Sequence, residues 1–459
     1  MHKHSFFEHF SPFACLIATS AVFLTAFLVS CDGEPEEPGL DAGSSAPIEK
    51  NAVSAAETAL SAATETSLSA NGKADANAGT RECIVYSPED RSDGICYVYT
   101  ERVYCDGNPD PETERVIFFR APANAVNVVI PDGVTEIGSS VFKDCAELES
   151  VVIPDSVRVI GSNAFQYCAG LKSLTLPDGV TIIGESAFQN CTGLESVAIP
   201  NSVSLISGLA FLHLPNLKTV TIPVHASIGG RAFEGCPKLE SVTLTEGGTV
   251  APPQEDAYIG SDAFANCSGL SQFEFPKGIR RILSSAFSRC DELICIEIPD
   301  GVTEIGKNVF WGCSRLESVV IPNSVSLIPE QAFQNLSSYS NLRSVTIPEH
   351  ASIGARAFEG CTKLESVSLT EGGTIAPARE DASIGEGAFA FCRSLKRIEF
   401  PEGIRSIEAG AFNGCTSLKE IAIPESVTEI AADTFQGSPC ADSVRRQMEA
   451  RRIKIKYAE

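Results

Sequence analysis

The chain has 459 residues, with 59 acidic and 35 basic side chains and a formal net charge of −24 at pH 7. A balance this acidic argues against binding to nucleic acid, whose phosphates attract basic surfaces. The 17 cysteines would by themselves suggest a metal or disulfide protein, but their spacing gives most of them another role.

Residues 1–30 have the features of an export signal peptide. A short head that carries Lys3 precedes an apolar run over about residues 10–29. The run ends in LVSC at residues 28–31, which looks like a bacterial lipobox. Cleavage before Cys31 would leave its amine and thiol open to acylation, and the acyl chains would hold the protein to a membrane leaflet. A plain transmembrane anchor over residues 10–29 is the alternative.

Residues 31–80 are expected to form the lipidated N-terminus and a disordered tether. They are rich in Ala, Ser and Glu and contain almost no aromatic residues, so they cannot bury enough surface to order themselves. Residues 81–122 contain RECIVYS, GICYVYTERVYC and RVIFF, which predict a β-rich N-terminal cap. In an exported cap, one disulfide is expected among Cys83, Cys96 and Cys105, and both Cys83–Cys96 and Cys96–Cys105 remain open.

From residue 123 to residue 440 the same phrase recurs. Its phenylalanines are 22 to 31 residues apart. A period in the twenties indicates a solenoid whose turns stack on one another. The 13 phenylalanines are Phe142, Phe165, Phe188, Phe211, Phe233, Phe264, Phe287, Phe310, Phe333, Phe358, Phe389, Phe412 and Phe435.

The segment LESVVIPDSVRVIGSNAFQYC at residues 148–168 shows the content of one turn. Leu148, Val151 and Ile153 alternate with outward residues, which predicts a short strand with one buried face. A proline and a tight turn end this strand, because proline lacks a backbone donor. A second extended piece follows, and a short helical turn is expected to begin near Phe165.

A glycine follows the inward isoleucine in many turns, as at Gly161, Gly184 and Gly306. Pro329 fills the same position in another turn, and proline cannot adopt a positive φ. We therefore infer that this glycine is required for close packing between turns and not for a left-handed backbone.

Most cysteines also belong to the repeat, three residues after its phenylalanine. Leu214 and Leu336 fill this position in other turns, so it is a buried apolar position where a thiol packs as a small hydrophobe. A zinc site would need a CxxC pair or nearby histidines, and neither accompanies these residues. The ten cysteines are Cys145, Cys168, Cys191, Cys236, Cys267, Cys290, Cys313, Cys361, Cys392 and Cys415.

Two turns are longer than the others and are near copies of each other. FEGCPKLESVTLTEGGTVAPPQEDAYIG begins at Phe233, and FEGCTKLESVSLTEGGTIAPAREDASIG begins 125 residues later, at Phe358. The added residues, at about 245–260 and 370–385, are rich in Gly, Pro and acid. Their acidic pairs lack the spaced oxygen ligands of an EF-hand loop, so solvated acid is the favoured interpretation and calcium the alternative.

Outward residues of the first strand are expected to form three columns. One is charged, the next holds Ser or Thr, and the third holds small residues, so that a partner protein can approach the sheet closely. Trp311 and Tyr339 are expected on the helical or loop side instead. The alternative is that these outward residues only keep the parallel sheet soluble and bind no partner. The charged column consists of Glu149, Lys172, Glu195, Lys218, Glu240, Glu317, Arg343, Glu365, Lys396 and Lys419.

Residues 441–459, ADSVRRQMEARRIKIKYAE, predict a short helix and a last strand that together form a polar C-terminal cap. This segment carries six basic and three acidic residues. Nucleic-acid binding is not expected of it, because the chain as a whole is acidic and carries an export signal.

Leu, Pro, Ile-Gly, Ala-Phe and Cys recur in register over roughly residues 124–440. In these motifs the chain resembles the leucine-rich repeats of BspA-like bacterial surface proteins, whose unit reads LxxLxLPxxVtxIgxxAFxxCxxL. The resemblance implies a right-handed, α/β horseshoe-like leucine-rich-repeat solenoid, β-dominated with short helical turns. It would have about 13 stacked turns of 22–31 residues. The resemblance also implies a role as a cell-surface adhesin or in host interaction.

No HExxH, GxSxG, phosphate-binding loop or dinucleotide fingerprint occurs, so we expect no enzyme, cofactor or small-molecule substrate. The expected function is protein–protein binding by a membrane-anchored lipoprotein, as adhesion to host or neighbouring-cell proteins. The expected location is the outer membrane or cell surface, with a periplasm-facing protein as the alternative. The alternative function is a structural or antigenic envelope lipoprotein without a dedicated ligand.

Overall fold

A computed structural model describes the backbone of residues 82–86, 96–105 and 108–120. It describes backbone and side chains of 125–130, 132–245, 256–335, 340–370 and 381–457. All of these residues belong to one compact unit, Ala78–Glu459. The export signal, Cys31, the tether and the central parts of the two long turns lie outside the described residues.

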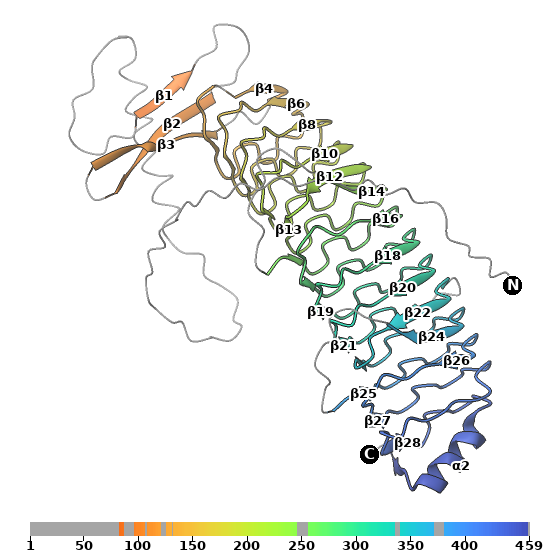
Figure 1. Ribbon diagram of the computed structural model, residues 1–459. Helices are drawn as coiled ribbons and strands as arrows, with labels where there is room; N and C mark the ends of the chain where they lie inside the picture. The colour runs from red at the N-terminus through yellow and green to blue at the C-terminus, as the bar shows by residue number, and fades with distance from the viewer. Residues whose placement is uncertain are drawn as a thin grey trace, which may run out of the picture. The chain divides into compact units, whose positions relative to one another are not determined.

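The array consists of stacked coils, and the first strand of successive coils builds one parallel face (Figure 1). This first-strand face is divided into sheets of two, five and five strands. Its strands are β4 (Asn127–Val129), β6 (Ser150–Val152), β8 (Leu174–Thr175), β10 (Ser196–Ala198), β12 (Thr219–Pro223), β14 (Ser241–Thr245), β16 (Gln272–Phe273), β18 (Cys295–Glu297), β20 (Ser318–Val320), β22 (Ser344–Ile347), β24 (Ser366–Leu369) and β26 (Arg397–Ile398).

The second extended piece of each coil builds another parallel face, in sheets of 11 and six strands. Its strands within the array are β5 (Glu136–Ile137), β7 (Val159–Ile160), β9 (Ile182–Ile183), β11 (Leu205–Ile206), β13 (Ser227–Ile228), β15 (Tyr258–Ile259), β17 (Arg281–Ile282), β19 (Glu304–Ile305), β21 (Leu327–Ile328), β23 (Ser352–Ile353), β25 (Ser383–Ile384), β27 (Ser406–Ile407) and β28 (Glu429–Ala431).

Additional elements extend this second face at both ends. At the N-terminal end, β1 (Glu82–Tyr86), β2 (Cys96–Cys105) and β3 (Asn108–Arg120) are antiparallel, and β3 pairs in parallel with β5. At the C-terminal end, β29 (Lys454–Lys456) pairs with β28, and α2 (Ala441–Arg451) precedes it. No helix in the part of the chain that the structure describes is long and apolar enough to cross a membrane.

The third side of each coil is made of turns and not of helix. In one coil, the amides of Asn163, Phe165 and Tyr167 donate to carbonyls of the next coil at 2.9, 2.7 and 2.8 Å. The intervening amides donate to carbonyls three residues back, and Asn163 and Tyr167 have φ of 57° and 65°. A helix needs successive bonds to the fourth preceding carbonyl. The short helical turn expected near Phe165 is therefore wrong, because three of these five amides bond to the next coil.

The repeat phenylalanines form one continuous stack through the array. Consecutive ring centroids lie 4.7 to 5.5 Å apart, with interplanar angles of 1° to 21°. All 13 rings are buried. Stacked coils thus bury together the apolar side chains that one coil could not bury alone.

The repeat cysteines line the same core as free thiols. From Cys168 onward, their thiols donate to the carbonyl of the repeat phenylalanine one coil before, as from Cys168 to Phe142 at 3.0 Å. Burial raises the pKa of the thiols of Cys313 and Cys361 to about 12. The predicted packing role is confirmed, since the thiols are buried and neutral.

The glycines after the inward isoleucine are confirmed as close-packing positions. Gly161, Gly184 and Gly306 have no positive φ. A Cβ added at Gly184 would lie 2.5 Å from the amide nitrogen of Ser162 in the preceding coil. Because backbone atoms cannot move aside as a flexible side chain can, a Cβ at Gly184 would press against the preceding coil.

Gly184→Ala is therefore expected to destabilise the array by about 1–3 kcal/mol, through overpacking against the preceding coil. Gly301→Ala is the matched control, since its added Cβ would meet nothing closer than 3.6 Å and its φ is not positive. Urea unfolding of both variants checks this prediction. Equal midpoints would show that close contact between coils is not the reason that position 184 is a glycine.

Candidate protein-binding face

Backbone hydrogen bonds align the charged column of the first-strand face. The amide of Lys218 donates to the carbonyl of Glu195 at 2.8 Å, and the amide of Glu240 donates to that of Lys218 at 2.9 Å. The amide of Lys396 likewise donates to the carbonyl of Glu365 at 3.0 Å. Each charge is thus held one strand spacing from the next, at the edge of the parallel face.

Side chains of opposite sign pair along this column. Lys218 Nζ lies 2.8 Å from Glu195 Oε2, and this hydrogen bond lowers the pKa of the Glu195 carboxyl and raises the pKa of the Lys218 amine. Glu365 lies between two cations, 2.7 Å from Lys396 Nζ and 3.8 Å from an Arg343 guanidinium nitrogen. The hydrogen bond from Lys396 lowers the pKa of the Glu365 carboxyl. These pairs contribute little to stability, because solvent screens them.

The structure places nine of the ten predicted charged residues just before strands of this face, eight of them exposed and Glu365 half-buried; Lys419 is exposed but lies beyond β26, the last strand of the face. The structure also shows an interruption that the sequence analysis missed. Ser271 and Ile294 occupy the column between Glu240 and Glu317, joined to them by the same backbone bonds. The column therefore consists of two charged runs, and aligning the coils by their leucines would have revealed the gap.

The two neighbouring columns match the prediction only in part. Ser, Thr, Ala and Val fill most of their positions, but Glu297 of β18 and Arg397 of β26 are also exposed there. Hydroxyls of Thr221 and Thr243 lie 3.1 Å apart across adjacent strands. Apolar side chains are also exposed here, Val129 at 71% and Val152 at 56%, and the register of β4 and β6 places these two opposite each other. The face thus offers an apolar spot at the paired Val129 and Val152, where a partner could approach without displacing a large side chain.

Other predicted site residues are placed only in part or not at all. Cys31 lies outside the described residues. The register of β1 and β2 places Cys83 opposite Tyr99 and Cys96 opposite Tyr86, so it does not place the two cysteines opposite each other. The disulfide stays a prediction. Among the described residues, no group of three or more His, Cys, Asp or Glu side chains is placed to hold a metal ion.

Comparison with known proteins identifies the repeat. The family described as "BspA type Leucine rich repeat region" matches residues 116–240, 227–365 and 338–454, in six copies. The chain belongs to the BspA-type leucine-rich-repeat family. No curated protein matches its sequence.

Solved structures of leucine-rich-repeat proteins are similar to it. A leucine-rich repeat protein from Bacteroides ovatus is 32% identical, with a TM-score of 0.54, over 73% of this chain and 84% of that one. A leucine rich cell surface protein from Faecalibacterium prausnitzii is 28% identical, with a TM-score of 0.39, over 82% and 96%. The pneumococcal vaccine antigen PcpA is 19% identical, with a TM-score of 0.40, over 83% and 100%.

Proposed function

We propose that this BspA-type protein is a membrane-anchored surface lipoprotein whose first-strand face binds proteins of a host or of neighbouring cells. The alignment of the charged column carries this proposal. Within each of its two charged runs, charges of alternating sign are fixed one strand apart, and a partner with the opposite pattern would be recognised through electrostatic complementarity. A non-enzymatic role is consistent with this, because solenoids of this kind present extended binding surfaces.

The alternative is a structural or antigenic envelope lipoprotein with no dedicated ligand. One observation favours it: Glu195 and Glu365 already pair with cations of their own column. A charged column that only keeps the sheet soluble would have this arrangement. The two functions can be distinguished by reversing charges on this face. Binding to a protein partner should weaken if the face binds proteins, and no binding should change if it has no ligand.

Replacing both Lys218 and Lys396 with Glu is expected to weaken binding of the full chain to its target by roughly tenfold or more. Two attractive contacts become repulsive, and like charges facing each other across an interface are costly. Saturation binding to immobilised extracellular-matrix proteins and to intact host cells measures the effect. Melting temperatures should change little, because the lost ion pairs are exposed.

Lys307→Glu is the matched control for this variant. Its Nζ lies 2.8 Å from Glu330 Oε2, the same separation as in the Lys218 pair, but it follows β19 and lies off the first-strand face. Binding should be unchanged in this control. If the double variant and the control bind equally well, the structural alternative is favoured.

Lipid anchoring at Cys31 is tested in cells by metabolic labelling with a fatty-acid analogue. Cys31→Ser is expected to lose the label, while Cys295→Ser, at an exposed cysteine of the array, should keep it. Protease treatment of intact cells should remove the array. Retained label in Cys31→Ser would contradict the lipobox, and a protected array would contradict a role at the cell surface.

A further inference from the structure

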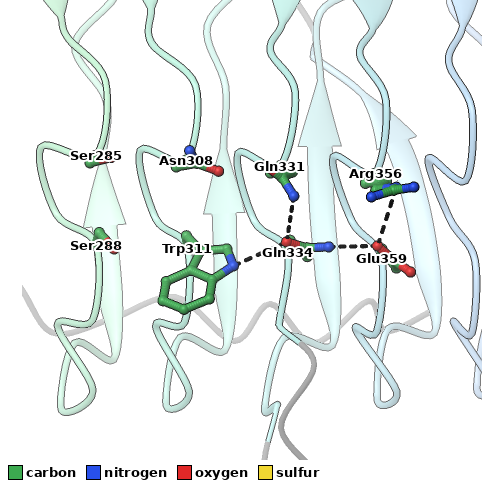
Figure 2. Close-up of a pocket in the computed structure, with 8 residues that line it drawn as sticks. All are labelled: Ser285, Ser288, Asn308, Trp311, Gln331, Gln334, Arg356 and Glu359. Atoms are coloured by element: carbon green, nitrogen blue, oxygen red, sulfur yellow. Dashed lines mark hydrogen bonds and ion pairs between the residues drawn. The ribbon is translucent and has the colours of Figure 1, made fainter.

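A polar hollow lies on the turn side of the array, away from the first-strand face. Four consecutive coils, those of Phe287, Phe310, Phe333 and Phe358, contribute to it, and its volume is about 550 Å³. Two rows of side chains line it, one two residues before the repeat phenylalanine and the other one residue after (Figure 2). Neither row belongs to the charged column, so this hollow is separate from the face proposed above.

Trp311 is the most distinctive residue of the hollow and the single tryptophan of the chain. It is only half-buried, and the core at this level is already closed by the stack of Phe287, Phe310 and Phe333. In the coils on either side, the same row holds Ser288 and Gln334. An indole in a row that is otherwise polar here contributes an aromatic surface to the outside of the molecule and is not needed by the core.

The side chains around the indole are held in place by hydrogen bonds. Trp311 Nε1 donates to Gln334 Oε1 at 3.0 Å, and Gln331 Nε2 donates to the same oxygen at 3.0 Å. Gln334 Nε2 in turn donates to Glu359 Oε2 at 2.5 Å, and Gln334 is only 4% exposed. Figure 2 shows this chain of bonds running across three coils. The indole and the amides are therefore preorganised, which lowers the entropic cost of binding a ligand.

The hollow is close to neutral in a strongly acidic chain. The lining carries one cation and one anion: the Arg356 guanidinium lies 3.9 Å from Glu359 and also 3.5 Å from Glu386, which does not line the hollow. The other lining groups are the indole, the amides of Asn308, Gln331 and Gln334, and two serine hydroxyls. Amides and hydroxyls both donate and accept hydrogen bonds, whereas an anion or a cation would find no uncompensated opposite charge among these lining residues.

We propose that this hollow binds a neutral oligosaccharide. The C–H face of a sugar ring packs on an indole, and its hydroxyl groups need donors and acceptors of the kind that Asn308, Gln331 and Glu359 provide. The guanidinium of Arg289 lies over the indole, 5.0 Å from the ring centroid. An incoming sugar ring displaces it, since Arg289 is exposed and a cation–π contact at an exposed site is weak.

The single tryptophan allows a direct test with the full-length chain in mild detergent. Its fluorescence is titrated with neutral oligosaccharides, namely maltohexaose, mannohexaose, galactohexaose and chitohexaose. At least one should give a saturable change in emission, with a dissociation constant of roughly 10 μM to 1 mM, which is expected of a shallow polar site. Calorimetry with the same oligosaccharide should show binding lost in Trp311→Ala.

Asn308→Ala provides a second variant, at a side chain that is half-exposed and lies outside the core. Since the φ of Asn308 is 57°, where alanine is less favourable than asparagine, the melting temperature of this variant is measured beside that of the wild type. This substitution should raise the dissociation constant of the oligosaccharide roughly fivefold, because hydrogen bonds to the sugar are lost. The control is Gln189→Ala, which removes a Gln166–Gln189 hydrogen bond of 2.6 Å in the row of Trp311 but in other coils. That control, and the Lys218→Glu, Lys396→Glu double variant, should bind the oligosaccharide as the wild type does.

The proposal is overturned if none of the four oligosaccharides binds, or if binding persists unchanged in both Trp311→Ala and Asn308→Ala. It is also overturned if only sulfated or sialylated oligosaccharides change the fluorescence, because the hollow would then favour anionic and not neutral ligands. A protein partner lost in Trp311→Ala, without any response to oligosaccharides, would assign the hollow to protein binding instead.

Discussion

The spacing between stacked phenylalanine rings is the constraint on which the rest of the array depends. Ring centroids recur every 4.7 to 5.5 Å, close to the distance of about 4.8 Å between hydrogen-bonded strands. One ring per coil therefore fills the core at the interval that the two parallel faces require. The glycines after the inward isoleucine allow the backbones to approach to this distance, and the buried thiols bond to the carbonyl of the preceding phenylalanine.

Because every coil repeats the same interval, equivalent positions of successive coils lie in columns. A residue 23 positions away in sequence becomes a direct neighbour, as Glu195 does to Lys218. The core side chains are buried and cannot contact a partner, so recognition has to come from outward positions. Two different surfaces arise from this principle, an alternating charged column on the first-strand face and a neutral hollow around Trp311 on the turn side. The array thereby separates its candidate binding sites by face and not by domain.

Much of the fold could be predicted from the sequence, since alternation, proline and the recurring phenylalanine constrain each coil strongly. Leu214 in the cysteine position was enough to predict buried thiols. The turn side could not be predicted: Asn163 and Tyr167 adopt positive φ without being glycine, because their amides bond to the next coil. Trp311 was expected on this side, but its hollow depends on small side chains such as Ser288 one coil away. Such a site becomes visible only once the coils are stacked.

The most direct measurement is amide hydrogen exchange in Phe188→Ala, which removes one interior ring between Phe165 and Phe211. Exchange should accelerate in that coil and its two neighbours, on the strand face and the turn side alike, because each coil contacts only its neighbours. Coils near Phe412 should keep their protection. Phe391→Ala is the control, since this phenylalanine is 41% exposed and lies outside the stack, and it should change nothing. Unchanged protection around position 188 in Phe188→Ala would contradict the view that the stacked rings hold the coils in register.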